Sequence, residues 1–391
     1  MSANTVGSGD LSPAEEGGGL AAAEFAHLQG ASYLNHAASS PLPRRSSAAL
    51  RAYVADRERV FHLYQAGQPD YALPVLQAKV GRLLNAPPEL IGFVPTTTEG
   101  LAGAVNSIAW RRGDNIVVPA NDFPGVLYPC LHLERRGVRV RQVPVDRHAD
   151  LDRVLEAIDG RTRAVAISWV HWLTGHRLDI ARLGAACRAA NVLSIVDAMQ
   201  GVGAIPLDIT AAQVDCCIAG SYKWLMGIPG TAAMYTSPRF VAEVTPDRAG
   251  YAGMTTSVFA TPRIDWLPGA ARFQVGGPIN PALVALEGSI DLLLEIGVPR
   301  VQSHLDALLD TLRTRAEAAQ LRVNSDLSPA HRSGFLNVTT GDPARDDRAV
   351  KALLAQRIVV GRRGPGIRIA PHLHNTVGEI ERAVEIIARE A

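Results

Sequence analysis

Lys223 has the surroundings that most clearly suggest chemistry. It lies in AGSYKWLMGIPG, after a strand-like run, with Tyr222 and Trp224 beside it and glycines on both sides. Such neighbours partly desolvate an amine, which lowers its pKa and leaves a neutral nucleophile that can form a Schiff base with a carbonyl. A solvated surface lysine is the alternative. The chain has only three lysines, and Lys79 and Lys351 lie in helix-periodic stretches where a solvated face is expected.

Asp197 follows the buried run VLSIV, and Gln200 lies on the turn after it. A carboxylate at the end of a parallel strand can bind a metal, cap a helix or pair with a ring nitrogen. If the carbonyl compound is pyridoxal 5′-phosphate (PLP), the opposite charge of Asp197 would keep the pyridine nitrogen protonated. The protonated ring is what lets this cofactor accept electrons.

Three threonines in FVPTTTEGLAGAV join a strand to a helix. Thr96 and Glu99 have the spacing of a capping box, which is a purely structural role. The same geometry would aim the hydroxyls and free N–H groups of Thr97 and Thr98 at an anion, and the helix dipole favours phosphate there.

Arg368 lies in the short strand-like segment GIRIAPH near the C-terminus. Its guanidinium suits bidentate capture of a carboxylate, so we expect Arg368 to bind the α-carboxylate of a substrate. The nearby Arg362 and Arg363 are interpreted as solvated or phosphate-steering.

The elements that must position these residues alternate between strands and helices from about residue 90 to 240. This order predicts a mostly parallel α/β sheet with ligands beyond its carboxyl ends. After residue 275 long helices precede short strands, which predicts a smaller α+β domain. The predicted divisions are a flexible tail at 1–20, a segment joining the small domain at 21–40, a large cofactor-binding domain at 41–275 and a small domain at 276–391.

Composition excludes several classes of protein. The net charge is +1, and no apolar run reaches the roughly 20 residues of a membrane span, so neither nucleic acid nor a membrane is expected as partner. The opening residues lack the pattern of a secretory signal, and a cytoplasmic location is expected. The four cysteines show no metal-type spacing and are read as reduced core residues, and no metal site is predicted.

Seven motifs between residues 31 and 390 together resemble the class V aminotransferase family of fold-type I PLP enzymes. This family includes cysteine desulfurases, kynureninases and isopenicillin N epimerase-like proteins. The motifs are, in order, YLNHAASSPLP, FVPTTTEGL, GDNIVVPANDFPGVLYP, VDAMQGVGAIPLD, SYKWL, FQVGGPIN and IRIAPHLHNT. The resemblance implies a PLP-dependent homodimer that acts on a small-molecule amino-acid substrate.

The resemblance also implies roles for individual residues. Lys223 corresponds to the lysine that attaches PLP, Asp197 to the pyridinium partner and Gln200 to a residue near the phenolic oxygen. Phe123 falls where many relatives place a histidine over the ring, and a phenyl group can stack there but cannot move protons. Further residues are implied as phosphate contacts (Thr97, Thr98, Ser221, Tyr222) and as substrate-pocket residues (Asn35, His36, Tyr251, His372).

Three departures from the family pattern bear on the reaction. The segment RIVVGRRGPGIRIAPH lacks the nucleophilic cysteine of the desulfurases, so persulfide formation on the enzyme is not expected. Gly277 stands where relatives often use a threonine to reach the partner subunit's phosphate, which leaves only a backbone contact. His171 and Trp172 stand where some relatives have an asparagine, and His171 is interpreted either as a proton shuttle or as a packed ring.

The function expected from these features is a carbon–sulfur β-lyase on an S-substituted cysteine, of the kind found in lincosamide antibiotic pathways. One alternative is decarboxylation and oxidative deamination of the same substrate to an aldehyde. Kynureninase-like or epimerase-like chemistry is another alternative, favoured by Phe123 and the SYK sequence. A third alternative is a catalytically silent PLP-fold binding protein, and the intact set of Lys223, Asp197 and Arg368 argues against it.

Overall fold

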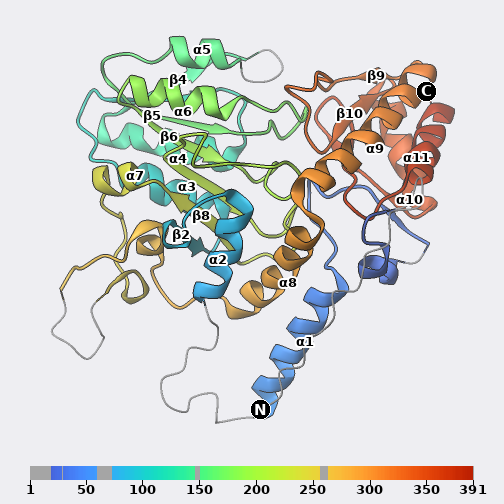
Figure 1. The fold of residues 1–391 in the computed structure, drawn as a ribbon. Coiled ribbons are helices and arrows are strands. Elements are labelled where there is room, and N and C mark those ends of the chain that lie inside the picture. The colour runs from blue at the N-terminus through green and yellow to red at the C-terminus, as the bar shows by residue number, and fades with distance from the viewer. Residues whose placement is uncertain (1–18, 29, 60–72, 146–149, 256–262, 391) are drawn as a thin grey trace.

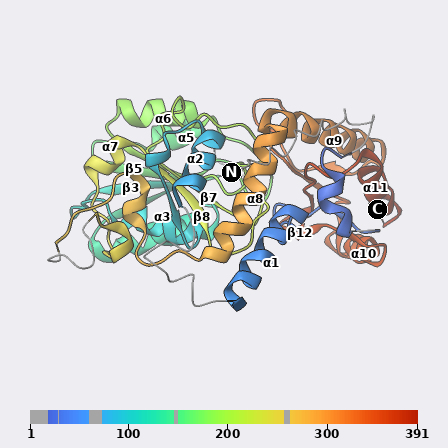
Figure 2. The same ribbon diagram turned by 60° about the horizontal axis from the view of Figure 1, so that its bottom comes forward.

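The computed structural model describes residues 19–28, 30–59, 73–145, 150–255 and 263–390. Most of the predicted tail at 1–20 lies outside these ranges. Figures 1 and 2 show a large sheet layered between helices and a smaller sheet with its own helices, with α8 (Asn280–Ile296) lying between the two. No helix in the described ranges combines the length and apolar character needed to cross a bilayer.

The large sheet is mostly parallel, as the alternating pattern predicts. Only β8 runs antiparallel to its neighbours, because β7 and β8 follow each other without a crossover helix. The seven strands among the described residues lie in the spatial order β2 (Ile91–Val94), β8 (Ala232–Thr236), β7 (Cys216–Gly220), β6 (Leu193–Asp197), β5 (Thr162–Ser168), β3 (Asn115–Pro119) and β4 (Arg139–Val143).

Both faces of this sheet are buried. Along β5, Val165 and Ile167 pack into one apolar cluster while Ala164 and Ala166 pack into a second cluster on the opposite face. Successive residues of a strand point to opposite faces, so a strand covered on both sides becomes a continuous apolar run. The helices of this region are α2 (Leu73–Leu84), α3 (Thr97–Asn106), α4 (Pro124–Leu131), α5 (Leu151–Glu156), α6 (Ile180–Ala189) and α7 (Pro238–Glu243).

The C-terminal sheet is antiparallel and carries a third apolar cluster. Its strands lie in the order β12 (Gly361–Arg363), β13 (Gly366–Ile369), β10 (Leu336–Thr339) and β9 (Arg322–Val323). The helices around it are α9 (Val298–Ala318), α10 (Pro343–Ala355) and α11 (Val377–Glu390). Along α9, Leu305 belongs to the core of the large region and Leu308 to that of the small one, so the change of core falls within this helix.

The N-terminal segment joins the two regions. β1 (Ser32–Tyr33) pairs in parallel with β11 (Ile358–Val359), and α1 (Arg44–Arg59) packs along α8. Phe25 belongs to the large-region core, whereas Leu34 belongs to the small-region core. The remaining short helical turns are η1 (Ala22–Leu28), η3 (Pro88–Leu90), η4 (His132–Arg136), η5 (Tyr251–Gly253) and η6 (Gly269–Phe273). The predicted domain boundaries stay a prediction.

Candidate active site

The carboxyl ends of neighbouring strands bring the predicted site residues to one edge of the large sheet. Asp197 is the last residue of β6, and its register partners are Ser168 on β5 and Ile218 on β7. Lys223 follows the end of β7 by three residues. Because β5, β6 and β7 are parallel, these chain ends meet where ligands bind in open α/β sheets.

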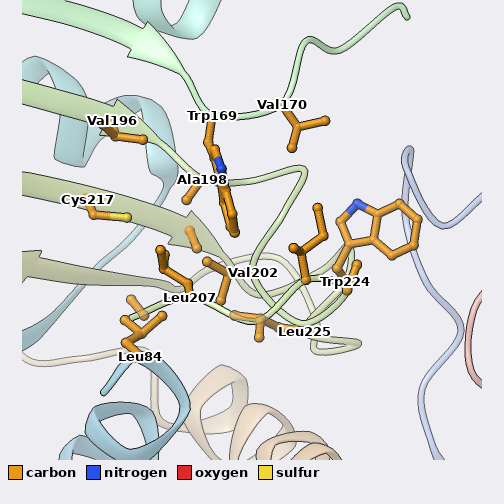
Figure 3. Packing of buried hydrophobic residues seen from close by; sticks show 14 of the residues in the cluster. Leu84, Trp169, Val170, Val196, Ala198, Val202, Leu207, Cys217, Trp224 and Leu225 are labelled. Carbon is orange, nitrogen blue, oxygen red and sulfur yellow. The ribbon is translucent and has the colours of Figure 1, made fainter. Parts of the chain in front are cut away.

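The backbone around Lys223 is held from several sides. Its carbonyl oxygen accepts hydrogen bonds from the Ser40 hydroxyl and from the Met226 amide, the latter over 2.9 Å. The next two residues, Trp224 and Leu225, are buried among the apolar side chains drawn in Figure 3. The amine of Lys223 therefore extends from a fixed loop, as a preorganised site requires.

Burial shifts the ionisation of both charged groups at this edge. Burial lowers the pKa of the Lys223 amine, an effect that the Asp197 carboxylate opposes and the nearby Arg368 and Arg363 reinforce. Burial raises the pKa of Asp197, while a hydrogen bond from the Met199 amide over 2.8 Å lowers it. A buried amine with a lowered pKa keeps more of its reactive neutral form near pH 7.

Phe123 lies close to the amine. The Lys223 Nζ is 5.7 Å from the centre of the Phe123 ring, and Trp172 packs edge-on against the same ring with centroids 5.7 Å apart. Phe123 cannot accept a proton, so it can supply only an apolar platform.

His171 is buried in the turn after β5. Its Nδ1 shares a hydrogen bond with the Thr174 hydroxyl over 3.0 Å, and its backbone bonds to His176 and Gly175 within the same turn. These contacts support packing in the turn, and the choice between a packed ring and a proton shuttle stays open.

The N-terminus of α3 faces the same edge. Thr96 caps the helix by accepting a hydrogen bond from the Glu99 amide over 3.1 Å, which confirms the predicted cap. Thr97 and Thr98 are then the first two helical residues, with backbone N–H groups that have no acceptor within the helix. The free N–H groups and the positive end of the helix dipole together make this end of α3 a suitable site for an anion.

Two glycines allow the backbone to approach these threonines closely. A Cβ on Gly220 would lie 2.8 Å from the Thr97 hydroxyl, and a Cβ on Gly125 would lie 2.7 Å from the Thr98 hydroxyl. Both distances are shorter than a carbon and an oxygen tolerate, so a side chain at either position would displace the threonine hydroxyl. The Thr97 hydroxyl donates to the Sδ of Met199 over 3.6 Å.

Arg368 is buried on β13, with only 2% of its surface exposed. One Nη donates to the Trp172 carbonyl over 2.9 Å, and the guanidinium lies 5.4 Å from the Phe335 ring centre. Its Nε and the Oδ1 of Asn35 are buried without a hydrogen-bond partner among the described residues. An unpaired buried donor is costly, and a bound carboxylate would satisfy it.

Gln200 is fixed at both ends of its amide. Its Nε2 donates to the Ala37 carbonyl over 2.9 Å, and its Oε1 accepts from the indole Nε1 of Trp224 over the same distance. Ser221 donates its hydroxyl to the Ile228 carbonyl. Tyr222 is half-buried, and burial together with the Asp197 charge raises the pKa of its phenol.

Two of the predicted substrate-pocket residues support the loop of Lys223. His36 bonds through Nδ1 to the Ser40 hydroxyl over 2.6 Å, and that hydroxyl in turn donates to Lys223. His372 bonds through Nε2 to the Trp224 carbonyl over 3.0 Å. Both rings are fully buried.

Tyr251 and Gly277 form a separate pair. Tyr251 is 65% exposed, and a Cβ on Gly277 would lie 3.0 Å from its hydroxyl. Gly277 lines a cavity of about 150 Å³ together with Glu99 and Thr231, and the described lining does not include Lys223.

Asp122 belongs to the site but was missed in the sequence. It is buried directly before Phe123 and accepts hydrogen bonds from the Ser168 amide over 2.9 Å and from the Phe123 amide over 2.6 Å. Its charge contributes to the raised pKa of Asp197. A polar residue just after the β3 strand was the available signal.

This arrangement fits PLP. Lys223 offers the amine for attachment, Asp197 a carboxylate for the ring nitrogen, and the N-terminus of α3 an anion site packed closely against Gly125 and Gly220. Phe123 offers a flat apolar surface beside the amine.

Comparisons with known proteins agree with this geometry. The family model for class-V aminotransferases matches residues 32–379. The chain is 27% identical over 312 residues to the uncharacterized aminotransferase YcbU of Bacillus subtilis, covering 78% of this chain and 80% of the relative. It is 26% identical over 377 residues to a probable cysteine desulfurase of Methanothermobacter thermautotrophicus, covering 89% and 92%.

Solved structures show the same fold. The cystine C–S lyase C-DES in complex with its product cysteine persulfide superimposes with a TM-score of 0.83 at 22% identity, over 93% of this chain and 99% of that one. The cysteine desulfurase CsdA of Escherichia coli superimposes with a TM-score of 0.80 at 20% identity, over 94% and 97%. With the family model spanning nearly the whole chain, the protein belongs to the class V aminotransferase family of fold-type I enzymes, and its cofactor is PLP.

Proposed function

We propose that the protein is a carbon–sulfur β-lyase that converts an S-substituted cysteine and one water molecule into a thiol, pyruvate and ammonia. The observation that carries this proposal is the placement of the thiols. Cys130, Cys187, Cys216 and Cys217 are the only cysteines, and all four are buried in helices or strands. No cysteine follows residue 217, so the segment before Arg368 has none.

Burial also makes these thiols poor nucleophiles. It raises the pKa of all four, that of Cys187 to about 12. A thiol that stays protonated and out of contact with the substrate cannot accept a sulfur atom. The absence of such an acceptor argues against persulfide transfer to the enzyme and favours release of the sulfur with its own substituent, as in β-elimination.

Residues of this chain can bind the substrate and move the proton during the proposed elimination. Arg368 binds the α-carboxylate through its unpaired Nε, which orients the α-carbon. The Lys223 Nζ, with its lowered pKa, takes the α-proton, and the thiolate leaves from Cβ as the C–S bond breaks. PLP, when bound, withdraws electrons from the bonds at the α-carbon. Phe123 shields one side from water and moves no proton.

The names of similar proteins support this substrate class. C-DES is described as a cystine C–S lyase, and several relatives are described as cysteine desulfurases. Both kinds of protein act on sulfur amino acids, and the lyase, like the chemistry proposed here, cleaves carbon from sulfur.

A labelled substrate separates the proposed reaction from its alternatives. The PLP-loaded protein is incubated with an S-alkyl-L-cysteine carrying carbon-13 in its carboxyl group, and the products are followed by mass spectrometry. Label in pyruvate together with free thiol supports β-elimination. Label in carbon dioxide with an aldehyde left on sulfur would instead establish decarboxylation and oxidative deamination. Anthranilate formed from kynurenine would establish the kynureninase alternative.

The oligomeric state, the location and the metabolic role proposed for the protein rest on the family resemblance. We propose a homodimer in the cytoplasm that serves specialised, antibiotic-type metabolism. Tyr251 and Ile279 support the dimer because both are large, exposed and close to the cavity that Gly277 lines. Sedimentation of the purified protein tests the dimer directly.

A further inference from the structure

The hairpin of β12 and β13 places two arginines on one face. Gly361 lies opposite Arg368, and Arg363 lies opposite Gly366. Directly opposite residues share a face in an antiparallel pair, as do residues two apart on one strand, so Arg363 and Arg368 are diagonal neighbours. Their Cα atoms are then about 7–8 Å apart.

Neither glycine places a side chain of its own between the arginines. On the other side of β13, Asn337 pairs with Arg368, and its side chain lies beside Gly366, where a Cβ would come within 2.5 Å of Asn337 Oδ1. A Cβ on Gly361 would lie 2.8 Å from Asn35 Oδ1 and 3.7 Å from Arg368 Nε, and it would fill the space beside these two unpaired atoms.

Arg362 provides a contrast within the same hairpin. It lies opposite Ile367, on the other face, where its Nε bonds to Asp347 over 2.7 Å and its Nη1 bonds to the carbonyl of Gly366 over 2.9 Å. Arg363 has only a 3.3 Å hydrogen bond to the Arg362 carbonyl, and no carboxylate of the described residues pairs with it.

The charge of Arg363 reaches the reaction centre. It contributes to the lowered pKa of Lys223, after burial and the charge of Arg368, and it adds to the burial that lowers the pKa of Arg368 to about 10. Two like charges on one open face repel each other unless anions lie between or beside them.

The two arginines differ in depth. Arg368 is buried, whereas Arg363 is exposed. A substrate held at its α-carboxylate by Arg368 would therefore extend its sulfur substituent outward, toward Arg363. The α-carboxylate satisfies the buried guanidinium of Arg368. The exposed guanidinium of Arg363 is then left for a second anionic group.

We propose that Arg363 binds a second anionic group at the outer end of the substrate, so that the preferred substrates are cysteine conjugates whose sulfur substituent ends in a carboxylate. This inference rests on the proposed function for the identity of the amino acid. It assigns Arg363 a role in specificity, where the sequence suggested only a solvated or phosphate-steering residue.

A matched pair of compounds tests the charge alone. S-(2-carboxyethyl)-L-cysteine and S-(2-carbamoylethyl)-L-cysteine have nearly the same shape and differ by one negative charge. Their dissociation constants are measured by titrating the cofactor absorbance of the PLP-loaded protein, and kcat/KM is measured by thiol release. We expect the acid to be preferred by roughly 2- to 5-fold, as for a charge pair at an exposed position.

Variants assign the preference to one residue. Arg363→Gln should weaken binding of the acid by the same factor and leave binding of the amide unchanged. Arg363→Lys should keep part of the preference for the acid. Arg362→Gln is the control and should change neither compound. Equal binding of acid and amide by the unaltered protein would overturn the proposal. The proposal would also be overturned if Arg363→Gln lost equal affinity for both compounds, because Arg363 would then act on the α-carboxylate that they share.

The two readouts separate this inference from the proposed function. If no thiol appears from either compound but the acid still binds more tightly through Arg363, the lyase activity fails while the anion site stands. If thiol is released from both at equal kcat/KM with equal dissociation constants, the lyase stands and the anion site fails.

Discussion

Asp122 accepts two hydrogen bonds from Ser168, one from its backbone amide over 2.9 Å and one from its hydroxyl. These bonds tie the turn that carries Phe123 to the end of β5, whose last residue pairs in register with Asp197. Phe123 and Asp197 are thus positioned relative to each other by a buried carboxylate that need not touch the substrate.

Asp122→Asn should destabilise the fold. The Ser168 amide, the Ser168 hydroxyl and the Phe123 amide all donate to the carboxylate, and an asparagine would turn its NH₂ group toward one of these donors. A buried unsatisfied donor costs about 1–3 kcal/mol. Urea unfolding should show a loss of this size, whereas Asp56→Asn, at an exposed position, should show none. An unchanged unfolding free energy would mean that the carboxylate is not needed here.

The strands of the large sheet could be predicted because their composition decides them. Runs such as IGFV and CCIAG are apolar at every position, and the structure buries every residue of β2 and β7. Alternation with helices predicted the parallel arrangement, but the reversed direction of β8 depends on a connection too short for a crossover. Composition alone does not reveal that.

The contacts that complete the site could not be predicted from the sequence. Asp122 and Ser168 are 46 residues apart, and the pairing of Gly361 with Arg368 depends on the register of a hairpin. Local patterns carry little information on such pairings, because a shift of one residue would move Arg363 to the other face. The interpretation of Arg363 as solvated was reasonable from composition, with 36 arginines in the chain.

Lys223 should carry the covalently attached cofactor. Borohydride reduction of the PLP-loaded protein, followed by peptide mass spectrometry, should place a pyridoxyl group on Lys223, and Lys223→Ala should carry none. Lys79→Ala should keep the label, because Lys79 pairs with Glu287 and Asp291. A label on Lys79 or Lys351 would disprove the assignment.

Arg368→Gln should weaken substrate binding without a comparable loss of fold stability. A buried charge that loses its partner costs roughly 2–5 kcal/mol, and here the substrate carboxylate loses the guanidinium. The unliganded protein should lose little stability, because burial already disfavours the charged form of Arg368 and this offsets the lost hydrogen bond to the Trp172 carbonyl. Titration of the cofactor absorbance measures the first effect and urea unfolding the second. A large loss of stability with unchanged affinity would make Arg368 a structural residue.

Acid should destabilise the fold through three buried histidines. His36 lies near His372 and His374, with ring centres 5.0 and 5.1 Å away. Burial lowers the pKa of all three, that of His372 to about 4 and that of His374 to about 3. Above pH 6.5 these rings are neutral in both states and contribute no pH dependence. As pH falls below 6.5 only the unfolded chain takes up protons, so stability decreases, by about 2 kcal/mol per histidine at pH 5.

His374→Phe should flatten this dependence. Both ring nitrogens of His374 are buried without a partner among the described residues, and the ring stacks on Phe25 with centroids 4.1 Å apart, so a phenyl ring replaces it without losing a hydrogen bond. Urea unfolding at pH 7 and at pH 5 should then differ less than in the unaltered protein, by about the contribution of one histidine. His132→Gln, at an exposed position, should keep the original difference. If His374→Phe keeps the full difference as well, the ring of His374 is not a group that resists protonation, and the acid sensitivity arises from other groups, among them His36, His372 and His304, whose pKa is also lowered.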